Sequence, residues 1–412
     1  MALIRPLQAL RYTAAAGPLA ELVAPPYDVI SPAERARLAA KRPAGSIHLI
    51  LPQGDEPYRA AARLLADWRE RHWLERDTEP AFFVLAQAFA IEGRAWERWG
   101  LLAGLELRGF DENIVLPHER TLAGPKEDRL RLIRACATNL SPIFTLVDTP
   151  LGLAELAGDS DAEAIADFHD DDGVHVRLWR LRPGPAARAL ADKVANQPVF
   201  IADGHHRYEI SLAYRNERRA ADPSVNGTLR PWDFVLTYLA STRDEGLAVL
   251  PTHRLLRGPL PADFAARLAR TCHQIPMASP AALWAALEAT SDATRGPRLG
   301  LLTPDGPPLL LEPGADGALQ LARLAPELAR LDVAFLHQVV LPGVPPEGFE
   351  YTHDALSAIA AAAAGRLALL LPPPRVNDVL DISQAGLTMP QKSTYFYPKV
   401  PTGLVFNPLE DS

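Results

Sequence analysis

The stretch Pro198-Val199-Phe200-Ile201-Ala202-Asp203-Gly204-His205-His206-Arg207-Tyr208 lies at the middle of the 412-residue chain. Its apolar first half predicts a buried strand that ends at Asp203 and Gly204. Helical spacing of apolar residues resumes from Tyr208, so the stretch predicts a strand, a tight turn and a helix. The backbone N–H groups and the positive dipole end at the start of such a helix favour an anion.

Five consecutive residues form this turn, Asp203, Gly204, His205, His206 and Arg207, and all of them except the glycine have ionisable side chains. Arg207 is a forked hydrogen-bond donor, and either imidazole can donate or carry a proton. Asp203 can cap the helix, hold a magnesium ion or orient an imidazole. Capping alone needs only the Asp and the Gly, so the turn predicts an oxyanion or phosphate cradle. Zinc is not favoured, because no Cys or carboxylate stands at ligand spacing.

The length of the chain favours two domains, because one hydrophobic core rarely serves 412 residues. A boundary is predicted near Gly258-Pro259-Leu260-Pro261, which separates residues 1–257 from a C-terminal α/β domain at 258–412. Predicted strands and helices follow one another without strict alternation. The pattern therefore predicts an α+β (mixed α/β) fold rather than a barrel or a doubly wound sheet.

Local patterns predict several elements that a structure can test. Residues 32–40 follow a Ser-Pro helix start, 81–91 and 96–107 form a hairpin of two strands, and 47–51 form a strand. The acidic segment 148–175 is expected to contain a helix and an exposed turn. Its charges are typical of a solvated face and do not favour a metal site.

Composition restricts the partners and the compartment. The net charge of −8 argues against non-specific binding of nucleic acid, although it permits a local basic pocket. Two cysteines, Cys136 and Cys272, are too few for a disulfide framework. No apolar run is long enough for a membrane helix, and the first residues lack a secretory signal pattern. We expect a cytoplasmic protein that does not bind membranes.

A second candidate site is the loop Pro117-His118-Glu119-Arg120-Thr121, followed by Lys126. Glu119, next to His118, is suited to act as a general base for a substrate hydroxyl if its pKa is raised. A polar loop with surface ion pairs is an equally good interpretation. Asp28 follows two prolines that fix its orientation, and Lys392 lies among aromatic residues near the C-terminus.

These segments together resemble the prokaryotic "domain of unknown function 1015" family over nearly the whole chain. The resemblance names no reaction. The motifs that carry it are Pro25-Pro26-Tyr27-Asp28-Val29-Ile30, Pro117-His118-Glu119-Arg120-Thr121, Asn139-Leu140-Ser141-Pro142-Ile143-Phe144, Asp203-Gly204-His205-His206-Arg207-Tyr208 and Met389-Pro390-Gln391-Lys392-Ser393-Thr394-Tyr395-Phe396-Tyr397-Pro398-Lys399.

The turn alone also resembles the signature of archaeal free-serine kinases, which share the ParB/sulfiredoxin-like nucleotide-binding fold. Gly204 and Arg207 match all three groups, whereas His205 stands where sulfiredoxins have their reactive Cys, so sulfiredoxin chemistry is not expected. The resemblance implies a ParB/sulfiredoxin-like core with a large inserted segment and a nucleotide at the turn. Glu119 is chosen as the catalytic residue by its chemistry and not by alignment.

The hypothesis from the sequence is a phosphotransferase that uses ADP or ATP with Mg²⁺ and acts on a small hydroxylated metabolite such as serine. The turn would hold the phosphates, Glu119 would accept the hydroxyl proton, and Lys126 or Lys392 would neutralise charge. Asp203 or Asp28 would help to hold the magnesium ion. Two alternatives stay open: a nucleotide-binding regulatory module, as in ParB proteins, and a phosphoester hydrolase. The oligomeric state is also open.

Overall fold

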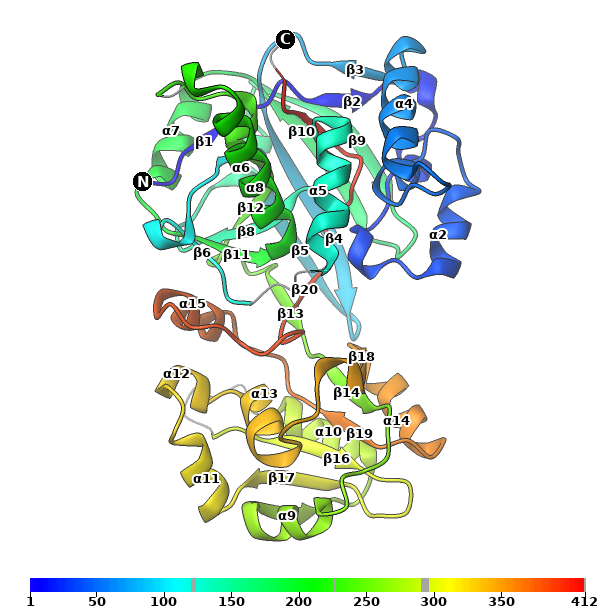
Figure 1. The fold of residues 1–412 in the computed structure, drawn as a ribbon, viewed down its shortest axis with the longest axis vertical. Coiled ribbons are helices and arrows are strands. Elements are labelled where there is room, and N and C mark those ends of the chain that lie inside the picture. The colour runs from blue at the N-terminus through cyan, green and yellow to red at the C-terminus, as the bar shows by residue number, and fades with distance from the viewer. Residues whose placement is uncertain (120–123, 226, 290–295, 411–412) are drawn as a thin grey trace. The chain divides into compact units, whose positions relative to one another are not determined.

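The computed structural model describes residues 1–119, 124–225, 227–289 and 296–410, and the chain forms two compact units (Figure 1). The first unit comprises Met1–Pro117, Thr121–Leu247 and Pro398–Ser412, and the second comprises Ala248–Tyr397 together with His118 and Glu119. Arg120 and Thr121 of the candidate loop lie outside the described residues. The mixture of sheets and helices in both units confirms the predicted α+β class.

The first unit is organised around a mixed sheet in the order β6-β11-β8-β12-β5-β4-β10-β9, and β1 pairs with β5. β11 runs parallel to β6 and antiparallel to β8, and β12 runs parallel to β8. The long β4–β5 hairpin confirms the predicted pair of strands. The strands are β1 (Ile4–Arg5), β4 (Phe82–Ile91), β5 (Arg94–Glu106), β6 (Val115–Leu116), β8 (Ile143–Val147), β9 (Ala162–His169), β10 (His175–Leu181), β11 (Val199–Asp203) and β12 (Phe234–Ser241).

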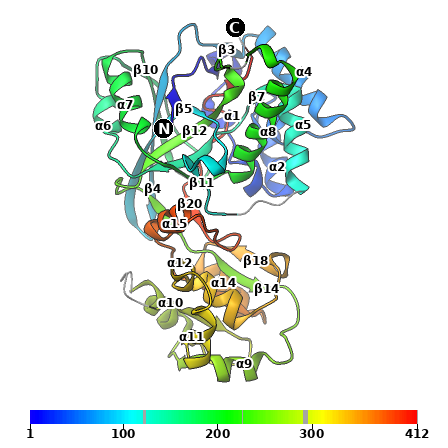
Figure 2. The same ribbon diagram turned by 60° about the vertical axis from the view of Figure 1, so that its left-hand side comes forward.

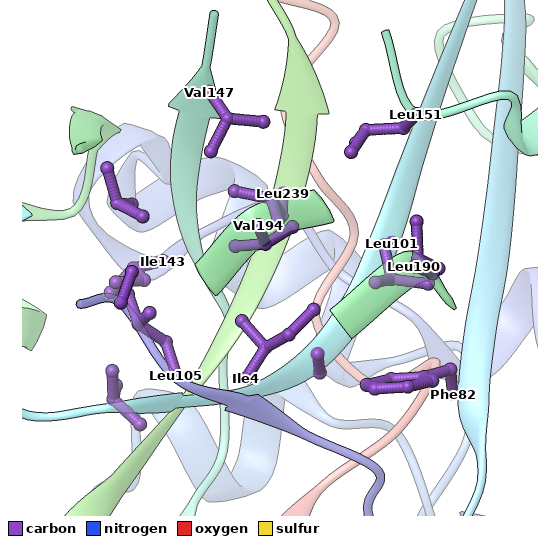
Figure 3. Close-up of a cluster of buried hydrophobic side chains, with 14 of the residues drawn as sticks. Ile4, Phe82, Leu101, Leu105, Ile143, Val147, Leu151, Leu190, Val194 and Leu239 are labelled. Carbon is purple, nitrogen blue, oxygen red and sulfur yellow. The ribbon is translucent and has the colours of Figure 1, made fainter. Parts of the chain in front are cut away.

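Helices cover this sheet, and α5 and α8 lie side by side (Figure 1). On α7, Leu190 and Val194 pack with sheet residues such as Leu101 and Ile143 in a buried apolar cluster (Figure 3). The predicted start of α2 is confirmed, because the Ser31 side chain accepts a hydrogen bond from the N–H of Glu34. The helices are α1 (Leu19–Leu22), α2 (Pro32–Ala39), α3 (Ile47–Ile50), α4 (Pro57–Glu70), α5 (Gly124–Cys136), α6 (Leu153–Ala157), α7 (Pro185–Ala195) and α8 (His205–Ala221).

The C-terminal segment of the chain packs into the first unit. Phe406 is fully buried in a second apolar cluster with Trp68 and Leu132. β21 (Asn407–Pro408) pairs with β7 (Thr138–Asn139), and the separate pair β2 (Leu10–Tyr12) and β3 (Leu74–Arg76) lies beside the same cluster. Residues from both ends of the chain therefore share one core.

One local prediction was wrong, and another was incomplete. Residues 47–51 are not a strand, because Ile47–Ile50 form the short helix α3. A short apolar run of this kind is compatible with a strand or with a helix. The helix is formed here because a helical turn buries Ile47, Leu49 and Ile50. The acidic segment contains the predicted helix, α6, and an exposed turn at residues 170–173, but residues 162–169 also form the edge strand β9, which was not predicted. Charged side chains on an edge strand discourage pairing with other chains, which accounts for the acidic composition.

The second unit contains an antiparallel sheet in the order β15-β17-β16-β19-β14-β18, and α14 contacts β14 and β18 (Figure 2). Leu283, Leu287 and Leu370 belong to its apolar core. A small pair of strands, β13 (Ala248–Leu250) and β20 (Tyr395–Tyr397), joins the two ends of the unit. Its other elements are α9 (Phe264–Thr271), α10 (Pro280–Glu288), α11 (Ala315–Leu321), α12 (Pro326–Ala329), α13 (Asp332–Phe335), α14 (Ala355–Ala363), α15 (Val376–Gln384), β14 (His253–Leu256), β15 (Cys272–Pro276), β16 (Leu299–Leu302), β17 (Leu309–Pro313), β18 (Phe349–Thr352) and β19 (Ala368–Leu370).

Within the described ranges, no helix combines the length and apolar character that a bilayer crossing requires.

Candidate functional site

The central turn has the predicted strand–turn–helix geometry. β11 ends at Asp203, and Gly204 adopts the left-handed conformation (φ +89°) before α8 begins at His205. The N–H of Tyr208 donates to the carbonyl oxygen of Gly204 at 3.0 Å, and no side chain caps the helix. The first N–H groups of α8 therefore have no intrahelical acceptor, which is the arrangement that favours an anion.

Glycine is required at position 204 for two reasons. Its positive φ is strained for any residue with a Cβ. A Cβ at this position would also lie 2.9 Å from Nε of Arg207 and 3.0 Å from its Cζ. The guanidinium group thus folds back over the turn into space that only glycine leaves open.

Asp203 binds two cations, one from the same turn and one from the distant C-terminal segment. Its Oδ2 accepts a hydrogen bond from Nη2 of Arg207 at 2.5 Å, and its Oδ1 accepts one from Nζ of Lys399 at 2.6 Å. Nη1 of Arg207 donates to the carbonyl oxygen of Pro142. All three charged side chains are less than one-fifth exposed. Two positive charges face one carboxylate, so the triad has a net positive charge.

This charge distribution lowers the pKa of Asp203 and raises the pKa of Arg207. Burial alone would raise the pKa of Asp203, but the charges of Lys399 and Arg207 outweigh burial and hold it well below its usual range. Burial lowers the pKa of Arg207, but the negative charges of Asp203 and Asp28 outweigh it and raise that pKa. Both shifts favour the ionised forms of Asp203 and Arg207.

A buried arginine on β5 fixes the segment that carries Lys399. Nη2 of Arg98 donates to the carbonyl oxygen of Pro398 and to Oε1 of Gln87, both at 2.6 Å. Nε2 of Gln87 in turn donates to the carbonyl oxygen of Lys399 at 3.1 Å. The guanidinium group of Arg98 also lies 4.7 Å from the ring centroid of Phe144. The backbone on both sides of Lys399 is therefore held where its ammonium group reaches Asp203.

A pocket opens beside Arg207 in the same unit. Arg129 lies on one of its walls, with its Cζ 4.8 Å from the ring centroid of Tyr27. An apolar lining with a few polar groups is typical of small-molecule sites. Its other lining residues are Ile50, Leu132, Ile133, Thr138, Asn139, Leu140, Ser141, Ile210, Ser211 and Val235.

A magnesium site built on Asp203 does not fit this geometry. Both carboxylate oxygens already accept hydrogen bonds from cationic side chains, and these positive charges would repel a metal ion. Asp28 is exposed and near enough to influence Arg207. In the part of the chain that the structure describes, no group of three or more His, Cys, Asp or Glu side chains is arranged to hold a metal.

The other predicted site residues of the first unit differ in how deeply they are buried. His205 is 6% exposed and contributes to the low pKa of Asp203, whereas His206 is half-buried. Lys126 on α5 forms an ion pair with Glu209 on α8, two residues beyond Arg207.

His118, Glu119 and Lys392 belong to the second unit and form a local network there. The imidazole Nε2 of His118 lies 3.0 Å from Oγ1 of Thr394. Oε1 of Glu119 accepts a hydrogen bond from the N–H of Ser393 at 3.2 Å. The carbonyl oxygen of Lys392 accepts one from Nη2 of Arg254 at 3.2 Å. The C-terminal motif thus spans both units, with Lys392 in the second and Lys399 in the first.

Sequence reasoning did not assign Lys399 to the triad, nor Arg98, Arg129 and Tyr27 to its surroundings. Lys399 is one of only five lysines and lies in the motif at residues 389–399, so the scarcity of lysine was a usable signal. Arg98 and Arg129 gave no such signal among 37 arginines, and Tyr27 was noted only as a neighbour of Asp28. Their importance depends on contacts between segments far apart in the sequence.

Comparison with known proteins identifies a family and several distant structures. The family model "Protein of unknown function (DUF1015)" matches residues 4–334. No curated protein matches the sequence. The solved structures found include a free serine kinase variant in complex with AMP, at 12% identity and a TM-score of 0.40, covering 75% of this chain and 92% of that chain.

Two further solved structures are similarly distant. A conserved hypothetical protein from Pyrococcus furiosus has 14% identity and a TM-score of 0.38, with coverage of 73% of this chain and 93% of that chain. SbnI with a C-terminal truncation, from Staphylococcus aureus, has 11% identity and a TM-score of 0.35, with coverage of 74% and 87%. Similarity this low supports no inference about a ligand or a residue of this chain.

Proposed function

The chain belongs to the DUF1015 family, whose description names no reaction, and we propose that it is a nucleotide-binding phosphotransferase acting on a small hydroxylated metabolite. The observation that carries this proposal is the net positive triad of Asp203, Arg207 and Lys399 at the N-terminus of α8. Phosphate groups would bind at this cradle, where helix N–H groups and a surplus positive charge attract anions. We assign this binding to the region 1–257, to which the C-terminal segment adds Lys399.

The pocket beside Arg207 would hold the nucleoside. Its apolar walls, which include Leu140 and Val235, would contact the base, and polar groups such as Asn139 and Ser141 would provide hydrogen bonds. A ligand that occupies both the pocket and the cradle is a compact apolar ring system joined to phosphates. ATP and ADP have this structure.

In the proposed reaction the terminal phosphoryl group passes to an acceptor hydroxyl. A bond forms between the hydroxyl oxygen and the terminal phosphorus, and the bond from that phosphorus to the bridging oxygen breaks. The electron pair stays on the leaving nucleotide, which is ADP from ATP or AMP from ADP. Glu119 would accept the hydroxyl proton, with His118 next to it, as proposed from their chemistry. The cradle contributes positioning and charge neutralisation, which dominate phosphoryl transfer.

Binding of ADP, ATP and CTP to the purified protein tests the cradle. We expect Lys399→Met to weaken nucleotide binding at least tenfold in calorimetric titrations, because it removes the surplus positive charge. Lys193→Met on α7 changes an exposed lysine away from the turn and is the matched control. Equal affinities of the two variants, or no nucleotide binding by the unmodified protein, would refute the cradle.

The reaction is tested separately with a panel of hydroxylated acceptors. Transfer of labelled phosphate to one acceptor supports a phosphotransferase. Release of inorganic phosphate without any acceptor would instead identify a hydrolase. Nucleotide binding without either reaction would favour a regulatory module.

A further inference from the structure

Tyr27 and Arg129 stack against each other at the pocket beside Arg207. Cζ of Arg129 lies 4.8 Å from the ring centroid of Tyr27, and both residues line the pocket. Tyr27 follows Pro25 and Pro26, whose fixed φ angles orient the backbone, and Arg129 lies on α5. The aromatic ring and the planar guanidinium group form one stacked pair, which we call the Tyr27–Arg129 platform.

The hydrogen bonds of Arg129 occupy the edge of its guanidinium group. Nε donates to Oδ2 of Asp128 at 2.5 Å, and Nη1 donates to the carbonyl oxygen of Ile50. All N–H bonds of a guanidinium group lie in its plane, so these contacts fix the plane and leave its faces for stacking. The side chain is only 12% exposed, so it is held in this orientation.

A tyrosine on a third helix fixes the carboxylate that orients Arg129. The hydroxyl of Tyr58 on α4 donates to Oδ1 of Asp128 at 2.6 Å. Tyr58 itself packs against the apolar cluster that contains Trp68 and Leu132. Residues of α3, α4 and α5 therefore hold the platform before any ligand binds, and a preorganised group loses little conformational entropy on binding.

The platform lies next to the cradle. Burial and the charge of Asp28 raise the pKa of Tyr27, whereas the positive charges of Arg207 and Arg129 lower it. Arg207 belongs both to the triad and to the lining of the pocket. A ligand with phosphates at the cradle therefore brings the group attached to them to the platform.

The polar lining residues read the edge of a base only coarsely. Oδ1 of Asn139 already accepts hydrogen bonds from the N–H of Leu236 and from Nδ2 of Asn407, both at 3.0 Å. Asn139 can therefore offer a ligand only its amino group. The hydroxyls of Ser141 and Thr402 lie 2.8 Å apart and hydrogen-bond to each other. Adenine and guanine both carry acceptor atoms, so a donor alone does not distinguish them.

We propose that the Tyr27–Arg129 platform stacks on the nucleobase and selects purines over pyrimidines by ring size, without distinguishing adenine from guanine. Every base has a π-face, and the stacking contact is larger for the two fused rings of a purine. Arg129 is the residue that sets this preference. The inference rests on the proposed nucleotide site and deepens it by naming the class of base.

Calorimetric titration of the full-length protein with ADP, GDP, CDP, UDP and pyrophosphate tests the platform. We expect ADP and GDP to bind within about threefold of each other and about tenfold more tightly than CDP and UDP. Arg129→Gln should reduce this purine preference to about twofold or less, because it removes the stacking plane. Arg129→Lys keeps the charge but lacks the plane, so it should not restore the preference.

Arg131→Gln is the matched control. Arg131 lies on the same helix, its side chain is 59% exposed, and it pairs with Glu127 at 3.0 Å. The substitution removes the same charge as Arg129→Gln, but it should leave the purine preference unchanged. Pyrophosphate has no base, so its binding reports on the cradle alone.

The series of ligands needs only the unmodified protein, so it tests the platform even if a variant fails to fold. The platform is overturned if purine and pyrimidine diphosphates bind equally, or if GDP binds as weakly as CDP. It is also overturned if Arg129→Gln and Arg131→Gln change the preference equally. Pyrophosphate binding alongside any of these results leaves the cradle intact. Failure of pyrophosphate and all four nucleotides to bind would overturn the proposed function as well.

Discussion

Arg207 in the first unit and Arg254 in the second are both buried arginines, but their surroundings shift their pKa values in opposite directions. Arg207 faces the carboxylate of Asp203, and its pKa is raised in spite of burial. Arg254 donates only to backbone carbonyl oxygens, and burial lowers its pKa to about 10.

The difference lies in the source of compensating charge. In the first unit the chain itself supplies the carboxylate and adds a second cation, Lys399, so the triad is stable without a ligand. In the second unit the positive charge of Arg254 is offset only by weaker interactions with Tyr351 and Glu119. A buried cation without a direct counter-ion is stabilised further when an anion binds nearby.

The largest expected effect comes from removing the carboxylate that Arg207 faces, because Arg207 then becomes, like Arg254, a buried cation without a direct counter-ion. Asp203→Ala removes the carboxylate and leaves two buried cations facing each other. We expect the free energy of unfolding to fall by about 3–5 kcal/mol, the usual cost of breaking a buried ion pair. Urea unfolding followed by circular dichroism measures this loss.

The control is an ion pair of similar composition on the surface. Asp171 also binds two cations, Arg37 and Lys41, but its side chain is 37% exposed. Asp171→Ala should cost about 1 kcal/mol or less. Equal losses in the two variants would show that burial does not strengthen the Asp203 triad.

Acid should weaken the second unit before the first. His253 is fully buried, its Nδ1 accepts a hydrogen bond from the N–H of Leu371 at 3.2 Å, and burial lowers its pKa to about 4. The unfolded chain, with an imidazole pKa of about 6.5, binds the proton more readily. Stability is therefore lost as the pH falls from about 6.5 towards 4, by up to about 3 kcal/mol.

The first unit responds in a different pH range. The pKa of Asp203 is depressed, so its contribution to stability persists until the pH falls below about 4, the unfolded value. Hydrogen exchange at pH 6.5 and 4.5 should show faster opening of β14 and β19 but little change in β8 and β11. His253→Asn should reduce this dependence, and His72→Asn, at an exposed site, should preserve it. If hydrogen exchange accelerates equally in both units at pH 4.5, the assignment of the acid sensitivity to His253 is contradicted.

The smallest expected effect comes from Gly204→Ala, which tests the close contact between the Arg207 guanidinium group and the turn. Gly204→Ala should cost about 1–2 kcal/mol for the left-handed backbone, and it should also displace the guanidinium group. Gly93→Ala has a similar φ of +80° with no atom within 4 Å of the added Cβ, so it tests the backbone cost alone. Nucleotide affinity should fall in the first variant only, as measured by calorimetric titration.

Much of the local structure could be predicted from the sequence. The Ser31-Pro32 start of α2, the β4–β5 hairpin and the strand–turn–helix at Asp203 are encoded by capping residues, turn residues and apolar periodicity within a few positions. Where the local signal was ambiguous, as at 47–51, only packing against the rest of the core selected a helix.

The sequence by itself determined an anion-binding turn, because Gly204 and the helix start act through neighbouring residues. The tertiary structure decided which cation faces Asp203, since Lys399 lies 196 positions away and Arg98 holds its backbone across 300 positions. It also decided that Tyr27 and Arg129 line one pocket. Such contacts depend on the burial of whole segments, for which no local pattern of residues is sufficient.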